Sequence, residues 1–420
     1  MKKIAALASS LFLISIACDA GLDEVKVRDP AAPSADSSAT AERPLNWGEN
    51  GSVVQLYRWK WKDIMANMGR IREMGFTTIL ISPHMSTCAG DFSAGYDPYD
   101  FENFNSGFGT ESDLGWLIGT AHFYNLQVYA DMPLNHMCPS RYDYPKFSSN
   151  DFHHNGAITD WNDWNNRETH DLFGLADLAQ ESEYVRGQLF NFVVKSNNFG
   201  FDGFRWDAAK HVPLWFWKDH IVNNVNRWGK FNYGEVYSAN LDELQQYVNT
   251  GMAVTDYNLY DAIISAFRYG GDLSQLDGRG FAARNSSASV TFVENHDVGA
   301  PPNRTMAYAF ISAYPGFPFY YSNTIDDPAI KNLVWVHNHK ANGAYITRWK
   351  DHDVLVFERD RSLLAGFNQT SHWVDVWVDT GWHNTKLHDY TGFSGDTSAG
   401  ADGRVKVSIP PLGYVMLPPG

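Results

Sequence analysis

Between residues 51 and 339, short β-rich runs alternate with amphipathic segments of helical length, and this alternation repeats eight times. A repeat of this kind is typical of a closed parallel β-barrel surrounded by helices. We therefore predict an α/β fold built on a (β/α)8 TIM barrel. The expected barrel strands cover residues 53–57, 77–82, 127–132, 203–206, 231–234, 253–257, 289–294 and 317–321.

Two departures from the repeat predict further parts of the chain. Residues 137–180, between strand three and its helix, are rich in Asn, Asp, His and Trp. Long connections in compact domains are usually functional, so we expect a small loop subdomain there, beside the C-terminal face of the barrel. From 340 to 420, strands follow one another without helices, which predicts an antiparallel β-sandwich domain. The barrel domain is assigned to residues 46–339.

The composition limits the class of partner. A net charge of -15 argues against nucleic-acid binding, which needs a basic face. Hydrophobic residues make up 44% of the chain, enough for a large core, and aromatic residues make up 15%. Aromatic faces suit flat, hydroxylated ligands such as sugars, although many of these rings will be core. We expect a monomer.

The first 45 residues predict export. Lys2 and Lys3 precede an apolar run over 4–17 that is too short for a permanent membrane span, which indicates an export signal over 1–18. Cys18 ends the run and resembles a bacterial lipoprotein cleavage site, although Ser15 stands where that pattern has Leu. A lipid anchor at Cys18 and ordinary cleavage nearby therefore both stay open. Residues 19–45 have the composition of a disordered linker, and we expect a protein that is secreted or held at an outer surface.

Two further cysteines follow predicted barrel strands. Without Cys18, Cys88 and Cys138 remain, an even number in an oxidising compartment. A disulfide between neighbouring loops is sterically plausible, and two free buried thiols are an open alternative.

Acidic residues and histidines collect where the predicted strands end. Strand three ends in residues 131–136 (DMPLNH), strand four in Arg205 and Asp207, strand five in Glu235, and strand seven in 294–297 (ENHD). In a barrel of this type, catalytic groups come from the C-terminal ends of several strands. Converging carboxylates repel one another, so a structural role explains this pattern poorly. The pattern indicates a catalytic site.

The chemistry that suits such carboxylates is glycoside hydrolysis, which needs an ionised carboxylate and a protonated carboxylic acid. Asp207 is expected to be the nucleophile, because Arg205 points to the same side of the strand and should keep the pKa of Asp207 low. Glu235, away from Arg205 and close to like charges, should have a raised pKa and act as acid and base. Asp297 would stabilise the cationic sugar. Adjacent strand ends should hold the first two carboxyl groups about 5 to 5.5 Å apart, as in a retaining enzyme.

Four motifs in order resemble the signatures of the α-amylase family, family 13 of the glycoside hydrolases, over residues 50–420. They are 131–136 (DMPLNH), 203–211 (GFRWDAAKH), 234–237 (GEVY) and 292–297 (FVENHD), and 174–178 (GLADL) adds a fifth near the end of the long loop. The resemblance implies the same roles for Asp207, Glu235 and Asp297. It also implies that Arg205, His136 and His296 line the cleavage subsite, that Tyr96 stacks on the sugar there, and that Lys210 lies toward the leaving group.

The same resemblance implies a structural calcium ion between the barrel and the long loop. Its ligands would be Asn135, Asp177 and the main-chain carbonyl of His211, which are oxygen donors that calcium prefers. A further ligand from the middle of the loop is not identified, and for Asp177 alone a helix N-cap is an equal alternative. Some family members need chloride, held by residues that correspond to Arg205, Asn295 and a basic residue near Phe319. Since Phe319 is not basic, we predict independence of chloride.

The resulting expectation is an exported endo-acting α-amylase that cleaves internal α-1,4 bonds of starch and maltooligosaccharides with retention. A maltooligosaccharide-forming or transglycosylating enzyme is the alternative within the family, and a non-catalytic surface glycan-binding protein is the alternative from another class. Trp161 and Trp164 could stack on glucose units or pack the loop. His153, His154 and His170 lack a metal-ligand spacing and are expected to be polar loop residues.

Overall fold

The computed structural model describes residues 51–139 and 142–420. The predicted export signal (1–18), the linker (19–45), the possible lipid site at Cys18 and the first residues of the barrel domain lie outside the described residues.

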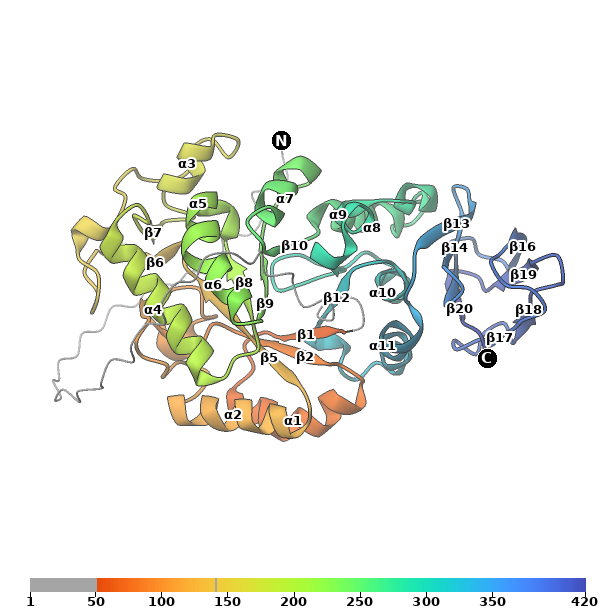
Figure 1. Cartoon of the computed structure of the whole chain (residues 1–420), viewed down its shortest axis with the longest axis horizontal. Coiled ribbons are helices and arrows are strands. Elements are labelled where there is room, and N and C mark those ends of the chain that lie inside the picture. Colours follow the sequence, from red (N-terminus) through yellow and green to blue (C-terminus); the bar gives the residue numbers. More distant parts are fainter. Residues whose placement is uncertain (1–50, 140–141) are drawn as a thin grey trace. The chain divides into compact units, whose positions relative to one another are not determined.

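The predicted barrel is confirmed (Figure 1). Eight parallel strands close in the order β1-β12-β11-β10-β9-β8-β5-β2, and nearly all of their residues are buried. The strands are β1 (Val53–Leu56), β2 (Thr78–Ile81), β5 (Gln127–Pro133), β8 (Gly203–Asp207), β9 (Phe231–Gly234), β10 (Ala253–Thr255), β11 (Ser289–Phe292) and β12 (Phe317–Tyr321). Because β11 ends two residues earlier than predicted, residues 294–297 lie in the loop that follows it.

Helices alternate with these strands along the chain. Several of them begin at a side-chain cap; for example, Thr110 and Asp113 form a capping box at the start of α2. The helical segment over 213–226 is not one regular α-helix, because the chain there forms α5, a π-helical turn and α6 in succession. The longer helices are α1 (Trp61–Glu73), α2 (Glu111–Phe123), α4 (Glu183–Phe199), α7 (Leu241–Val248), α8 (Tyr257–Ala266), α10 (Arg304–Ala313) and α11 (Pro328–Lys340). The shorter ones are α3 (Trp164–Thr169), α5 (Leu214–Phe216), α6 (Asn223–Arg227), α9 (Gly280–Arg284), η1 (Gly90–Phe92), η2 (Ser149–Asp151), η3 (Ala209–His211), η4 (Trp217–Val222), η5 (Leu273–Leu276), η6 (Ser286–Ala288) and η7 (Ser322–Thr324).

Two small sheets form outside the barrel, in the loops that follow β2 and β5. β3 (Ser86–Thr87) pairs with β4 (Pro98–Asp100), and β6 (His136–Pro139) pairs with β7 (Leu175–Asp177). The β6–β7 pair closes the base of the long connection. A disulfide joins Cys88 to Cys138 with their Cα atoms 6.2 Å apart, so of the two alternatives for these cysteines the structure has the bridge.

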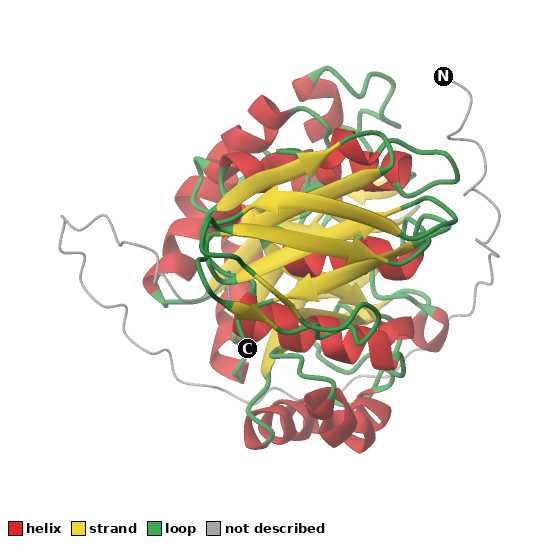
Figure 2. Cartoon of the chain, turned by 90° about the vertical axis from the view of Figure 1, so that its right-hand side faces the viewer, coloured by secondary structure: helices red, strands yellow, loops and turns green. Residues whose placement is uncertain are grey.

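The C-terminal part of the chain contains antiparallel sheets, as predicted (Figure 2). The four-stranded sheet and the β16–β19 sheet described below contribute side chains to one apolar cluster. This cluster is the core of the sandwich. The four-stranded sheet has the order β13 (Tyr345–Lys350), β14 (Val354–Arg359), β15 (Leu363–Asn368) and β20 (Gly413–Leu417); the two-stranded sheets pair β16 (Val374–Asp379) with β19 (Arg404–Ile409) and β17 (Lys386–Leu387) with β18 (Thr397–Ser398).

The other face of the four-stranded sheet packs on the barrel. Phe357 and Phe367 both contact the ring of Phe310 on α10, with ring centroids 5.9 and 5.7 Å apart. Arg359 donates a hydrogen bond to the carbonyl of Ala313, 3.0 Å away. The barrel and this sheet therefore share one apolar core. Within the described residues, no helix combines the length and the apolar character that crossing a membrane requires.

Candidate active site

The carboxylates predicted at the strand ends meet around one guanidinium, that of Arg205 on β8. Its Nη1 lies 2.6 Å from Asp131 Oδ1 and 2.9 Å from Asp207 Oδ1, and its Nη2 lies 3.1 Å from Glu235 Oε2. Arg205 and Asp207 point to the same side of the strand because side chains alternate along it. The structure thus brings the predicted nucleophile and the predicted acid together at the C-terminal ends of β8 and β9.

The expectation that Glu235 lies away from Arg205 is wrong. The planar fork of the guanidinium reaches carboxylates on two sides, so one arginine can bind both strand ends. Glu235 is also held by hydrogen bonds from the main-chain N–H of Ala208 to Oε2 (3.0 Å) and from the hydroxyl of Tyr257 to Oε1 (3.4 Å). Glu235 therefore accepts hydrogen bonds from a main-chain amide and a hydroxyl group in addition to its contact with Arg205.

The pKa shifts of these two groups also run opposite to the expectation. Burial raises the pKa of Asp207 well above its usual range against the opposing charge of Arg205, and the carboxylates of Glu235 and Asp131 reinforce this shift. Burial also favours protonation of Glu235, but Arg205 and the Ala208 amide outweigh it and lower the pKa of Glu235. These two shifts favour a proton on Asp207 over a proton on Glu235.

Asp297 lies in the loop after β11, and about half of its side chain faces solvent. Burial in the cleft and the like charge of Glu235 raise the pKa of Asp297 to about 7, although Arg205 opposes this shift and water moderates it. His296 lies 3.1 Å from the Asp297 carboxylate. Burial lowers the pKa of His296 to about 3, so its ring is neutral near pH 7.

An aromatic layer adjoins the carboxylates. The rings of Tyr96 and His296 stack with centroids 5.0 Å apart, and Tyr57 stacks on His296 from 4.7 Å. The hydroxyl of Tyr96 donates to Asp131 Oδ2 (2.7 Å), and His136 Nε2 hydrogen-bonds the main-chain oxygen of Tyr96 (3.1 Å). Burial lowers the pKa of His136 to about 4. The four predicted subsite residues Tyr96, His136, Arg205 and His296 are thus joined by direct contacts to each other or to Asp131.

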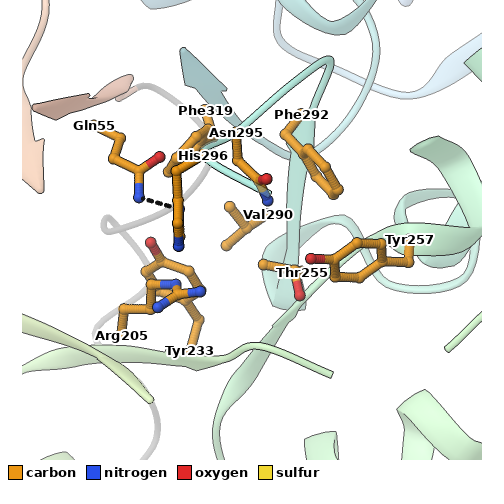
Figure 3. Close-up of a pocket in the computed structure, with 10 residues that line it drawn as sticks. All are labelled: Gln55, Arg205, Tyr233, Thr255, Tyr257, Val290, Phe292, Asn295, His296 and Phe319. Atoms are coloured by element: carbon orange, nitrogen blue, oxygen red, sulfur yellow. Dashed lines mark hydrogen bonds between the residues drawn. The ribbon is translucent and has the colours of Figure 1, made fainter. Parts of the chain in front are cut away.

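A pocket lies between Arg205 and the loop after β11 (Figure 3). Gln55 on β1 hydrogen-bonds His296 Nδ1 at 2.9 Å, the contact drawn in the figure. The hydroxyl of Tyr233 and Oε1 of Gln55 are buried and have no hydrogen-bond partner among the described residues. The pocket lining comprises Gln55, Arg205, Tyr233, Thr255, Tyr257, Val290, Phe292, Asn295, His296 and Phe319.

Lys210 and His211 lie on η3, which follows Asp207 and Ala208. Lys210 Nζ donates to the main-chain oxygen of Tyr237 (2.9 Å) and lies 3.6 Å from Glu243 Oε2. The ring of Trp161 meets that of His211 edge-on, with centroids 5.8 Å apart, and its centroid also lies 5.8 Å from that of Phe173. The side chains of Trp161 and Phe173 are exposed. Trp164 instead packs against Tyr247, with Arg167 over its ring. Of the two tryptophans, Trp161 is exposed and Trp164 is partly buried.

The three predicted calcium ligands converge. The side-chain oxygen of Asn135 faces the main-chain oxygen of His211 at 2.7 Å and Asp177 Oδ1 at 3.3 Å, with no hydrogen-bond donor among the three oxygens. If the amide is turned over, its nitrogen donates to both of the other oxygens. A cation among an amide oxygen, a carboxylate and a carbonyl removes this repulsion, and these are donors that Ca²⁺ accepts. The residues present therefore fit the ion. His153 binds the other oxygen of Asp177 through Nδ1 (2.6 Å), and the described residues contain no group of three or more His, Cys, Asp and Glu that could hold a metal.

Sequence reasoning missed several residues of the site. Gln55, Tyr57 and Tyr257 touch His296 or Glu235, and Ala208 supplies a main-chain donor. A polar residue inside the first predicted strand and aromatic residues at two strand ends were the available signals. The role of Ala208 depends on its backbone conformation, which leaves no sign in the residue type.

Comparison with known families decides the assignment. A family model described as the catalytic domain of alpha amylase matches residues 58–380. The chain belongs to the α-amylase family. A second model, for the alpha-amylase C-terminal region, matches residues 363–416.

Individual relatives are distant. An alpha-amylase-related protein of Drosophila varians is 30% identical over 326 residues, which cover 67% of this chain and 66% of the relative, just under two thirds of its length. Among solved structures, the α-amylase of Geobacillus thermoleovorans complexed with acarbose superposes with a TM-score of 0.77 at 22% identity, covering 88% of this chain and 98% of that one. A cyclomaltodextrin glucanotransferase with a three-domain ABC distribution gives 0.76 at 21% identity, covering 88% and 99%. At these identities the structures support the fold.

Proposed function

We propose that this protein is a retaining α-amylase that hydrolyses internal α-1,4-glucosidic bonds of starch and maltooligosaccharides. The observation that carries the proposal is the binding of Asp207 and Glu235 by the same guanidinium at neighbouring strand ends. Glycoside hydrolysis with retention needs two carboxyl groups, one on each side of the scissile bond. Membership of the α-amylase family supports α-linked glucans as the substrate class.

In the first step, an Asp207 oxygen attacks the anomeric carbon while Glu235 donates a proton to the glycosidic oxygen, and the leaving chain departs with a new hydroxyl group. In the second, Glu235 takes a proton from water, which attacks the same carbon and releases Asp207 with retention. Asp297 stabilises the cationic sugar in both transition states. Proton transfer by a positioned carboxyl group contributes about a hundred- to ten-thousandfold to such a reaction.

The first step requires a proton on Glu235 and a negative charge on Asp207. The pKa shifts of the two groups, raised for Asp207 and lowered for Glu235, favour the opposite arrangement. Arg205 contacts both groups, so its charge remains paired whichever of them is ionised. A sugar seated on the Tyr96 ring places its glycosidic oxygen as a new acceptor for the Glu235 proton. We therefore assign to substrate binding the shift of the proton toward Glu235.

The proposal is tested with purified protein on soluble starch and maltoheptaose. Early mixed oligomers indicate endo action, and proton NMR of the first products should show the α anomer before mutarotation. Asp207→Asn should lower turnover by at least about a thousandfold with an unchanged circular dichroism spectrum. A β anomer as the first product, or an active Asp207→Asn variant, would refute the mechanism.

We also propose a structural Ca²⁺ held by Asn135, Asp177 and the carbonyl of His211, and independence of chloride. A bound Ca²⁺ would contribute positive charge that joins the long loop to η3. Phe319 lines the same pocket as Arg205 and Asn295 and places an aromatic ring where a third anion ligand would be basic. Strong activation by added chloride would contradict the second proposal.

A transglycosylating enzyme is the second candidate, favoured by the exposed pair Trp161 and Phe173 next to His211. Aromatic faces there could bind an acceptor sugar and raise its effective concentration relative to water. Mass spectrometry of products formed with excess labelled maltose distinguishes the two reactions. Labelled products longer than the acceptor indicate transfer, and their absence indicates hydrolysis.

A further inference from the structure

The residue after the nucleophile has an unusual backbone conformation. Ala208 has φ 49° and ψ 33°, in the left-handed region. A residue with a side chain adopts this conformation at a cost, and it persists where the surrounding structure holds it. This conformation turns the chain from β8 into η3. The N–H of Ala208, in the peptide unit that precedes the turn, donates to Glu235 Oε2, 3.0 Å away.

Glu235 is bound to this strand end twice. Its own main-chain N–H donates to the carbonyl of Trp206 (2.9 Å), and its side chain accepts from Ala208. The turn continues directly into η3, where the N–H of His211 donates to the carbonyl of Ala208 (2.8 Å). The peptide unit between Asp207 and Ala208 therefore helps to hold the Glu235 carboxyl group, together with Arg205 and Tyr257.

Two residues of the long loop, Ile158 and Leu172, pack against Ala208. Ile158 and Leu172 form a buried apolar cluster with Ala208, and this cluster is separate from the main core. Leu172 is itself fixed by a tight hairpin turn, in which Phe173 (φ 54°) and Gly174 (φ 83°) are both left-handed and Leu175 donates to the Leu172 carbonyl (3.0 Å). The cluster packs on the methyl group of Ala208, on the side of the chain that the loop covers.

We propose that Ile158 and Leu172 are positioning residues for Glu235, which act by packing against Ala208 and so holding in place the peptide unit whose N–H donates to the Glu235 carboxyl group. This inference rests on the proposed function, because it assigns to the long loop a part in proton delivery by Glu235. Neither residue contacts the reacting atoms. Their truncation leaves the arginine contacts of Asp207 in place and releases the peptide unit that orients the acid.

Two substrates with different leaving groups distinguish this positioning role from a general loss of structure. Cleavage of a maltooligosaccharide needs a proton on the leaving oxygen, whereas fluoride leaves α-maltosyl fluoride without one. The ratio kcat/KM reports on steps up to the first bond cleavage, so the second step does not obscure the comparison. Leu172→Ala and Ile158→Ala should each lower kcat/KM about ten- to a hundredfold on maltoheptaose and less than about threefold on α-maltosyl fluoride.

Two further variants complete the experiment. Phe147→Leu truncates a buried residue of the same loop that packs against Phe101, Phe152 and Tyr184, so it should change both substrates by the same factor. Ile158→Val removes one methyl group and should give a smaller split than Ile158→Ala, which keeps the test open if the alanine variants fold poorly. Glu235→Gln is the benchmark and should lose maltoheptaose cleavage while retaining that of the fluoride.

The outcomes of the two proposals are distinct. Equal losses on both substrates for the Ile158 and Leu172 variants, with the expected split for Glu235→Gln, would overturn the positioning role alone. Equal losses for Glu235→Gln would overturn the assignment of Glu235 as the acid, and the positioning role with it.

Discussion

At the scale of single residues, the site depends on an imbalance of charge. Arg205 contacts the carboxylates of Asp131, Asp207 and Glu235, and all four side chains are buried or nearly so. One positive charge does not neutralise three negative ones, so protons make up part of the difference. This explains why the pKa values of Asp131 and Asp207 are raised. The pKa of Glu235 is lowered because Arg205 and an additional N–H donor outweigh the effect of burial.

Removal of Arg205 should therefore destabilise the protein in a pH-dependent way. Arg205→Met should lower the free energy of unfolding by about 3 to 5 kcal/mol at pH 7, because the carboxylates then lie buried without a counter-charge. Without Arg205, the folded-state pKa values of Asp131 and Asp207 rise further above the unfolded ones, and that of Glu235 rises from its lowered value. The deficit should therefore shrink as the pH falls toward about 4 and the groups take up protons. Urea unfolding at pH 7 and pH 4.5 measures this.

Arg284→Met is the matched control, since Arg284 pairs with Asp242 at the surface. It should cost less than about 1 kcal/mol at either pH. A deficit of the same size for Arg205→Met at both pH values would contradict the charge argument.

The pH dependence of activity follows from Asp207 and Asp297. Both must be ionised for cleavage, and both have raised pKa values, that of Asp297 about 7. A carboxyl group with a raised pKa loses its charge as the pH falls through that value. We expect kcat/KM on maltoheptaose to fall as the pH is lowered through about 7, and a profile that stays flat down to pH 5 would contradict this.

At the scale of elements, the long loop is attached to the barrel at three kinds of contact. The disulfide between Cys88 and Cys138 joins it to the loop after β2, and the Ile158 and Leu172 cluster joins it to the turn after β8. At the third, the oxygens of Asn135 just before β6, Asp177 on β7 and His211 on η3 converge. The first two contacts need no ligand, whereas the third places oxygens in repulsion unless a cation lies among them or the amide turns.

Chelation should therefore loosen this element. Dialysis against a chelator should lower the melting temperature, and added Ca²⁺ should restore it; at a hundredfold excess over Kd the ion would stabilise the folded state by about 2.7 kcal/mol. Asn135→Ala should melt at the same temperature with and without chelator. No chelator effect on the unaltered protein, together with no calcium by elemental analysis, would refute the site.

At the scale of the whole molecule, the barrel and the four-stranded C-terminal sheet share a core. The contacts of Phe310 with Phe357 and Phe367 are part of one apolar cluster that extends from the barrel strands to β15 and β20. Separation of the two parts would expose these aromatic faces to water. The sandwich also has its own cluster, so its inner layer does not depend on the barrel.

We expect the two parts to unfold together. Calorimetry should show one endotherm for the barrel and the C-terminal sheets, and a chain that ends at residue 341 should aggregate because α10 loses its cover. Two well-separated endotherms, or a soluble and active truncated chain, would contradict this coupling.

Much of the fold was predictable because it follows from local pattern. Alternation of strand and helix determines a barrel, and the barrel in turn determines that the ends of strands four and five are neighbours. Asp207, Glu235 and Asp297 could therefore be placed near one another from residue order, and Arg205 beside Asp207 from the two-residue period of a strand. The break in the helix over 213–226 and the early end of β11 were not predictable, since both depend on packing against other elements.

The sequence by itself determined the barrel, the C-terminal antiparallel domain and the set of carboxylates at the strand ends, because periodicity and spacing are properties of the chain. Only the tertiary structure decided which carboxylates Arg205 binds, whether Cys88 and Cys138 form a bridge and how the Ala208 N–H meets Glu235. The physical reason is that pKa values and hydrogen bonds depend on distances of a few ångströms between residues far apart in the chain. Those distances reversed the expected order of the Asp207 and Glu235 pKa values and placed Ile158 and Leu172 of the long loop against Ala208.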